Sequence, residues 1–242
     1  MYERYMKTFY QPRLLKLILP IAFLASVMSI GCESPQLQPQ SAIPTYDPPP
    51  PTDPTIRGNK CSTLKPNVLS LASDKEITTT AAYPTFLFFV PTTSARQVQF
   101  VLKDSNSQTI YRRTYDLSGQ SGILRLALPI DGSVSEVAAG KAYKWEFNLI
   151  CDPDNRKKDD FAVGKLQRLP LSDASKSQLG QASLREQLLR YRADGFEYDT
   201  LVVLDALRRA NPKDLAIQSE WETWLERYKL GDLKQLPAIK LK

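Results

Sequence analysis

The chain has 242 residues, with 32 lysines and arginines against 26 aspartates and glutamates and no histidine. The lack of histidine excludes Ser-His-Asp and Cys-His catalysis and every metal site that needs imidazole. Four of the basic residues lie in the first 31 residues beside one glutamate, and the rest of the chain carries 28 basic and 25 acidic residues. That balance gives no electrostatic footprint for nucleic acid, so we predict no nucleic-acid partner.

Residues 1–31 have the pattern of an export signal. Basic residues between Arg4 and Lys16 precede an uncharged, mostly apolar stretch from Leu17 to Ile30. At about 1.5 Å per residue this stretch covers roughly 20 Å, less than the roughly 30 Å hydrocarbon core of a bilayer. We therefore predict a signal peptide and an exported protein of the periplasm or cell envelope.

Cys32 follows the small residues Ser29 and Gly31 in a segment that resembles the lipobox of bacterial lipoproteins. In those proteins the cysteine is diacylated and becomes the new N-terminus. The resemblance implies a lipidated Cys32 that tethers the protein to a membrane. Small residues also suit ordinary signal peptidase, and an uncleaved anchor is a third alternative; the sequence leaves all three open.

Residues 32–58 are predicted to form a linker. Eight prolines fall between Glu33 and Gly58, including four in succession from Pro48 to Pro51. A stretch with so few large apolar side chains does not bury enough surface to fold, and proline favours an extended spacer. The linker either holds a domain away from a membrane or is a disordered tail.

Three cysteines in an exported chain leave one without a partner. Lipidation of Cys32 leaves Cys61 and Cys151 as a pair, for which we predict a disulfide. A zinc site is the alternative, but two isolated cysteines and no histidine do not fill four tetrahedral positions. We predict no metal and no cofactor.

Residues 59–171 show the period of two that is typical of half-buried antiparallel strands. The run Phe86–Val90 is apolar throughout and predicts a central strand that is covered on both faces. Turn signals recur at the spacing of a β-sandwich. We expect an α+β protein whose first domain is an immunoglobulin-like antiparallel β-sandwich of six or seven strands. The alternating apolar residues are Val98, Phe100, Leu102, Leu124, Leu126, Leu128, Tyr143, Trp145, Phe147 and Leu149.

Residues 172–242 change to a helical period and predict three amphipathic helices. These helices either stack as a small unit or cover one face of the sheet. Gly195 and Pro212 stand 17 apart, as the corresponding glycine and proline do in the second half of a tetratricopeptide repeat, so the region resembles a hairpin of that kind. The three apolar stripes are Leu179, Leu184, Leu188 and Tyr191; Leu201, Leu204 and Leu207; and Ile217, Trp221, Trp224, Leu225 and Tyr228.

Two local patterns suggest chemistry that the neighbouring residues argue against. The acidic loop from Asp152 to Asp160 offers oxygen donors for calcium but lacks the glycine and the late glutamate of a calcium loop, which favours a solvated hairpin tip. Ser62–Lys65 spells the Ser-x-x-Lys of penicillin-binding enzymes, yet Pro66 breaks the helix that this motif opens, and the partner motifs are absent.

Two aromatic groups are candidates for binding or for the core. Tyr143, Trp145 and Phe147 share one strand face and suit stacking on sugars, but the same alternation favours the core. Trp221 and Trp224 share a helical face, for which packing on the preceding helix is favoured.

Together these stretches are similar to a family found in cyanobacteria, the domain of unknown function 928. The resemblance covers roughly residues 58–230 and implies no activity. It is carried by Tyr83–Pro91, Phe100–Asp104, Gly140–Trp145, Cys151–Pro153, Gly164 with Arg168, Tyr198–Asp199, Leu204, Leu207–Pro212 and Trp221.

We therefore expect a non-enzymatic binding or scaffolding module of the cell envelope, with an envelope protein or a glycan as partner. This hypothesis predicts an exposed aromatic or apolar patch. A carbohydrate- or peptidoglycan-active enzyme is the first alternative and requires two carboxylates in a cleft, about 5 to 10 Å apart. A periplasmic assembly factor is the second and requires an open groove on the last two helices.

Overall fold

A computed structural model describes residues 61–62, 68–72 and 76–241, which form two β-sheets and four α-helices. The α+β class is as predicted. The signal segment 1–31, Cys32 and the linker 32–58 lie outside the described residues, as does most of Ser62–Lys65.

The larger sheet has five strands in the order β2-β8-β7-β4-β5. All neighbours are antiparallel except β2 and β8, which are parallel. The strands are β2 (Glu76–Thr79), β4 (Gln97–Lys103), β5 (Thr109–Asp116), β7 (Ala142–Ile150) and β8 (Asp160–Arg168).

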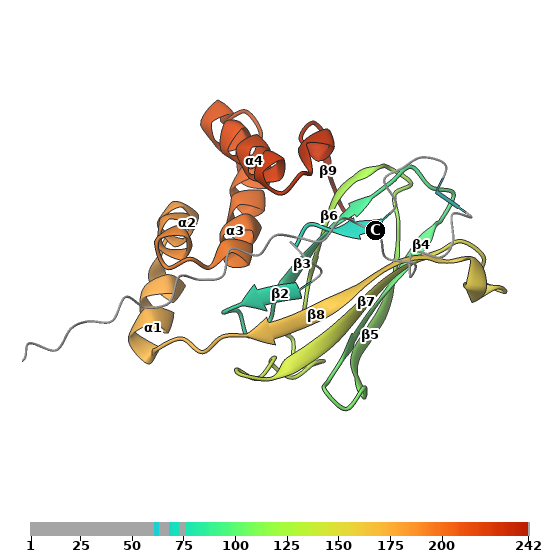
Figure 1. Cartoon of the computed structure of the whole chain (residues 1–242), viewed down its shortest axis with the longest axis horizontal. Coiled ribbons are helices and arrows are strands. Elements are labelled where there is room, and N and C mark those ends of the chain that lie inside the picture. The colour runs from blue at the N-terminus through green and yellow to red at the C-terminus, as the bar shows by residue number, and fades with distance from the viewer. Residues whose placement is uncertain (1–60, 63–67, 73–75, 242) are drawn as a thin grey trace, which may run out of the picture. The chain divides into compact units, whose positions relative to one another are not determined.

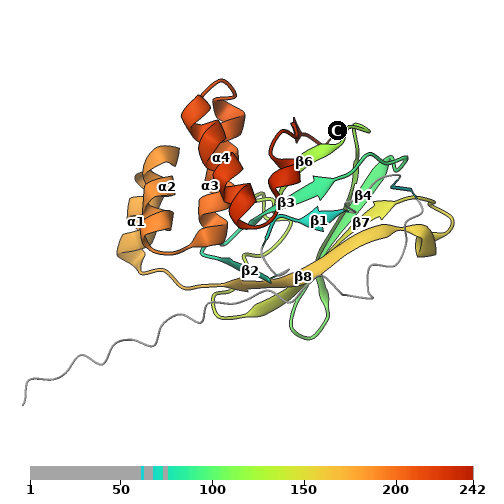
Figure 2. The ribbon, with the colours of Figure 1, turned by 45° about the horizontal axis from the view of Figure 1, so that its top comes forward.

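The smaller sheet has four strands in the order β1-β3-β6-β9, and Figure 2 shows β1, β3 and β6 side by side. Here β9 runs parallel to β6. With nine strands and two parallel pairs, the β-region is larger than the wholly antiparallel arrangement of six or seven strands that we predicted. The strands are β1 (Leu69–Ser70), β3 (Thr85–Val90), β6 (Gly122–Ala127) and β9 (Ala238–Ile239).

The two sheets pack through aromatic side chains. Phe86 of β3 lies 4.6 Å from Phe100 of β4, and Phe88 lies 3.9 Å from Phe147 of β7, between ring centroids. Successive residues of a strand point to opposite faces, so β3 sends Phe86 and Phe88 to this side and Leu87 to the other. All are fully buried. The prediction of a central strand that is covered on both faces is confirmed.

The helices lie next to one another (Figure 1), and the last three share one hydrophobic cluster with the sheets. They are α1 (Asp173–Gln181), α2 (Leu184–Ala193), α3 (Glu197–Ala210) and α4 (Leu215–Arg227), with short 3₁₀ turns at Arg156–Lys158 and Gly231–Leu233. Helix α3 contacts β3 and β2 and buries its stripe of Leu201, Leu204 and Leu207. The contacts combine the two arrangements that we expected, because α2 and α4 pack on α3, and α3 packs on the strands.

The stripe that we assigned to one helix before residue 194 is divided between two helices. Ser183 and Glu186 form a reciprocal capping box that starts α2, so the chain breaks after Gln181. Each side of this box satisfies a backbone or side-chain donor at the helix start. The capping box therefore starts a new helix, although the apolar stripe continues across the break. The described residues therefore contain four helices where three were predicted.

The segment after α4 returns to the smaller sheet as β9, which was not predicted. The Ile123 N–H donates to the Pro237 carbonyl at 2.8 Å. A Cβ at Gly122 would come within 2.4 Å of that carbonyl oxygen, so only glycine allows this approach.

Candidate functional site

Two adjacent residues of α3 fasten the helix to the sheets. The Tyr198 hydroxyl donates to the Thr85 carbonyl at 3.1 Å and accepts the Leu87 N–H at 3.2 Å. The Asp199 carboxylate accepts hydrogen bonds from the Thr79 hydroxyl and from the N–H and hydroxyl of Thr80. Burial raises the pKa of Asp199, and these bonds oppose the rise.

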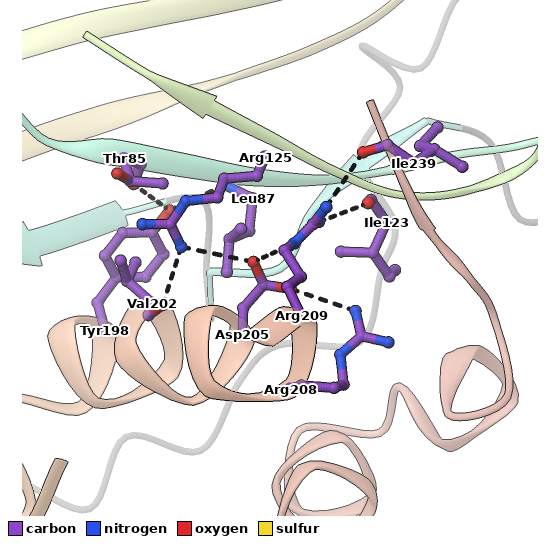
Figure 3. Close-up of polar contacts among 10 residues, drawn as sticks. All are labelled: Thr85, Leu87, Ile123, Arg125, Tyr198, Val202, Asp205, Arg208, Arg209 and Ile239. Carbon is purple, nitrogen blue, oxygen red and sulfur yellow. Dashed lines mark hydrogen bonds and ion pairs between the residues drawn. The ribbon is translucent and has the colours of Figure 1, made fainter. Parts of the chain in front are cut away.

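Further along α3, one buried carboxylate holds three guanidinium groups (Figure 3). Asp205 is 0 % exposed and receives Arg209 Nε at 2.7 Å, Arg208 Nη2 at 3.2 Å and Arg125 Nη1 at 3.5 Å. We call these four residues the arginine cluster. Three unit charges meet one carboxylate, so the cluster carries two excess positive charges.

Other guanidinium donors of Arg209 and Arg125 reach backbone carbonyls. Arg209 donates to Ile123 at 2.8 Å and to Ile239 at 3.2 Å, which connects α3 with both β6 and β9. Arg125 donates to Val202 at 3.0 Å. Carbonyl dipoles stabilise the guanidinium groups without neutralising them, so the positive excess persists.

Arg208 lies between α3 and α4. Its guanidinium stands 4.3 Å above the ring of Trp221, a cation–π contact, and donates weakly to the Leu236 carbonyl at 3.4 Å. Burial lowers the pKa of Arg208, and Asp205 opposes that shift. Arg208 Nε and Trp221 Nε1 are both buried donors without an acceptor among the described residues.

A pocket of about 600 Å³ opens beside the arginine cluster. It lies between the end of α3, the helix α4 and the segment that leads into β9. Its volume falls in the range of about 300 to 1,000 Å³ of small-molecule sites. No carboxylate is among its lining residues, and we call it the cationic pocket. The lining residues are Arg208, Arg209, Pro212, Gln218, Lys234, Gln235, Leu236, Pro237, Ala238 and Lys240.

A second pocket of about 340 Å³ lies between the α2–α3 turn, α3 and α4. We call it the helical groove. It contains two carboxylates, but Glu197 accepts the Tyr228 hydroxyl and Glu220 pairs with Arg192. Its lining is Arg192, Gly195, Glu197, Thr200, Leu204, Glu220, Thr223, Trp224 and Arg227.

Cys61 and Cys151 form the predicted disulfide, with their Cα atoms 5.4 Å apart. Asp160 lies beside it and accepts a hydrogen bond from the Ser62 hydroxyl. Burial raises the pKa of Asp160. The two sulfurs and the Asp160 carboxylate come within 4.8 Å of one another, but sulfurs that are bonded to each other offer no thiolate to a metal.

The structure places the other sequence candidates in packing roles. Tyr143, Trp145 and Phe147 are buried between the sheets, and Trp221 and Trp224 are buried in α4. The large apolar side chains that stay exposed among the described residues are aliphatic, so they form no aromatic surface. They are Ile130, Val163, Leu184, Leu189 and Leu215.

The acidic loop is the tip of the β7–β8 hairpin, where cations neutralise its carboxylates. Lys158 pairs with Asp152 at 2.6 Å, and Arg156 pairs with Asp159 at 2.6 Å. This arrangement is that of the solvated hairpin tip that the sequence favoured over a calcium loop.

The arginine cluster was missed by reasoning from the sequence. A signal was present: Asp205, Arg208 and Arg209 stand three and four residues apart in residues 201–210, which are otherwise apolar, and this is the spacing of intrahelical ion pairs. That spacing usually marks an exposed helix face, and nothing local shows that α3 buries it under Arg125 and β9.

The fold defines an α+β protein with two β-sheets and a group of helices that contacts strands of both sheets through α3. Residues 53–238 match the family described as Domain of Unknown Function (DUF928), and the chain belongs to this family. The match spans strands of both sheets and all four helices. No curated protein matches the sequence. Among the described residues, no helix combines the length and the apolar character needed to cross a membrane.

Proposed function

We propose that this protein is a non-enzymatic binding module of the cell envelope, and that the cationic pocket binds a negatively charged ligand. The observation that carries the proposal is the lining of the pocket. Arg208, Arg209, Lys234 and Lys240 face it without a carboxylate, next to a cluster with excess positive charge. Such a site attracts anions and discriminates against cations.

The cellular location in this proposal rests on the sequence. In this proposal the signal peptide 1–31 exports the chain, a lipidated Cys32 tethers it to a membrane, and residues 32–58 space the folded part from the surface. Three further features belong to this proposal. They are the cyanobacterial source that the resemblance implies, the immunoglobulin-like strand arrangement and the tetratricopeptide-like hairpin.

Binding has more support than carboxylate catalysis. A glycosidase needs one carboxylic acid with a free proton and one free carboxylate. In the helical groove, both carboxylates already hold partners, Tyr228 on Glu197 and Arg192 on Glu220. The same groove favours a second candidate function, an assembly factor that holds a partner between α3 and α4, because an open groove at this place is what that hypothesis requires.

Isothermal titration calorimetry of the purified chain tests the anion site. Pyrophosphate and citrate serve as probes at about 20 mM and about 300 mM salt, because added salt screens exposed charge–charge attraction. We expect saturable binding that weakens at the higher salt concentration. The double variant Lys234→Gln/Lys240→Gln should bind at least about tenfold more weakly.

The matched control is Lys213→Gln/Lys141→Gln, which removes the same charge from exposed positions outside the pocket. Equal weakening in both double variants would show attraction to net charge alone and would contradict the proposal. The assembly factor is tested by the binding of a fluorescently labelled partner peptide. If Trp224→Ala loses peptide binding while its anion binding is unchanged, the assembly factor is favoured.

Intact mass tests the location. The protein is purified from membrane and soluble fractions and measured with and without reduction and alkylation. We expect a chain that starts at Cys32 with added acyl groups, and alkylation of Cys61 and Cys151 only after reduction. An unmodified Cys32 would contradict the lipid anchor.

A further inference from the structure

We propose that the ligand of the cationic pocket is an acidic saccharide, a sugar chain whose uronate carboxylates meet the cationic residues. This inference rests on the proposed function, and it names the chemical class of the ligand for the same site. Three features of the pocket carry it: the placement of the charges, the carbonyl end of α3 together with the capped start of α4, and the amide and apolar groups beside the cations.

The positive charge around the pocket is moderate and spread out. Two excess charges remain after five cationic groups are set against three carboxylates nearby. Lys234 already pairs with Glu226 at 3.3 Å, whereas Lys240 has no ion pair among the described residues. Isolated single carboxylates along a chain match this distribution better than one compact, multiply charged group. The groups are Arg125, Arg208, Arg209, Lys234 and Lys240, and Asp205, Glu222 and Glu226.

The backbone around the pocket does not suit phosphate. Phosphate sites use free N–H groups at a helix N-terminus or in a loop. Here the pocket lies at the C-terminal end of α3, where the helix presents carbonyl groups and not N–H groups. The N-terminus of α4 is nearby, but the Asp214 side chain already accepts from the N–H groups of Ala216 and Ile217.

The amide side chains are held in a way that suits hydroxyl groups. The nitrogens of Gln218 and Gln235 both donate to the Glu222 carboxylate, at 3.1 and 3.0 Å. No donor among the described residues reaches either amide oxygen, so both can accept a hydrogen bond from a sugar hydroxyl.

An apolar surface completes the wall. Pro237 and Ala238 are exposed beside the half-buried Leu236, on the strand that Arg209 holds through the Ile239 carbonyl. A sugar ring has an apolar face of C–H groups beside its hydroxyls, so this surface matches a ring and gains nothing from an inorganic anion. Guanidinium and ammonium groups then bind the carboxylates.

Calorimetry with four probes tests the inference on the purified chain. The probes are an oligogalacturonate, an oligomannuronate, the methyl ester of the oligogalacturonate, and pyrophosphate. At least one of the two oligouronates should bind at least about tenfold more tightly than pyrophosphate and than the methyl ester. The ester keeps the rings and removes the charge, and pyrophosphate keeps charge without rings.

Two variants separate the contributions. Gln235→Leu should weaken oligouronate binding about fivefold or more and leave pyrophosphate binding unchanged, because only the sugar uses the amide. Lys240→Gln should weaken both. Circular dichroism before each titration confirms that the exposed substitutions leave the fold intact.

The outcomes separate this inference from the function on which it rests. Pyrophosphate binding that equals or exceeds oligouronate binding, with no effect of Gln235→Leu, would overturn the acidic saccharide and leave the anion site standing. Binding of the ester as tightly as the acid would overturn the role of charge. No binding of any probe at low salt would overturn both proposals.

Discussion

The two faces of β3 are stabilised by different chemistry. On the side toward the larger sheet, Phe86 and Phe88 pack on other aromatic rings. On the side toward α3, Tyr198, Asp199 and Asp205 join the helix to the sheets through hydrogen bonds and ion pairs. The first face depends on shape and tolerates any side chain that fills it. The second depends on particular atoms, and it is also where the pockets lie.

The largest loss of stability is expected at the disulfide, which belongs to the β-region alone. The double variant Cys61→Ser/Cys151→Ser opens a loop with a sequence separation of 90 residues. The chain-entropy relation gives a loss of about 4 to 5 kcal/mol in the free energy of unfolding. Urea denaturation of the oxidised, reduced and variant proteins measures it. Reduced wild-type protein that is as stable as oxidised protein would contradict the expectation.

The sharpest test of the comparison pairs two substitutions that conserve shape. Asp205→Asn keeps the volume but removes the only carboxylate of the arginine cluster, so the buried Arg208 and the partly exposed Arg125 and Arg209 lose their counter-charge. We expect a loss of about 3 to 5 kcal/mol. Leu124→Met, on the aromatic side of the smaller sheet, should cost less than about 1.5 kcal/mol. Similar losses in chemical denaturation would show that the two faces do not differ in kind.

Tyr198→Phe is expected to have an intermediate effect. Removal of one hydroxyl leaves the Thr85 carbonyl and the Leu87 N–H of β3 without their partner, at a cost of about 1 to 3 kcal/mol. Tyr83→Phe is the matched control, because Tyr83 is half-buried and its hydroxyl makes no hydrogen bond with a described residue. Thermal unfolding of both variants measures the difference, and equal melting temperatures would refute it.

The smallest effect is a change in the pH dependence of stability. Because burial raises the pKa of Asp199, the folded protein binds this proton more tightly than the unfolded chain. The stabilisation is complete below the unfolded pKa of about 3.9 and is lost as the pH rises through the higher folded pKa. The stability of wild type relative to Asp199→Asn should therefore increase on acidification from neutral pH toward pH 4. A difference that stays constant with pH would contradict the raised pKa.

The aromatic face could be predicted from the sequence, and the polar face could not. Alternation located the inward residues of β4, β6 and β7, because a period of two follows directly from strand geometry. The pairing of Cys61 with Cys151 followed from cysteine arithmetic. In contrast, Arg125 and Asp205 are 80 residues apart, and no local pattern brings them together.

The last segment of the chain was the other failure of prediction. β9 is two residues long and too short to show any period. Its place depends on Gly122, which alone leaves room for the Pro237 carbonyl, and on Arg209, which binds the Ile239 carbonyl. This segment also forms one wall of the cationic pocket. Because the position of the segment could not be predicted from the sequence, the candidate site could not be predicted either.

The parallel pairing of β9 with β6 has a consequence for how the molecule behaves among its copies. An open strand edge is a template on which a strand of another chain can add. At one margin of the smaller sheet, β1 pairs with β3, and the Tyr198 hydroxyl accepts a hydrogen bond from the β3 backbone. At the other margin, β9 pairs with β6. Loss of β9 after a proteolytic cut between Leu233 and Ala238 would expose the backbone of β6. Trimming of this tail would thus add an open edge to the smaller sheet, on which a strand of another chain can pair.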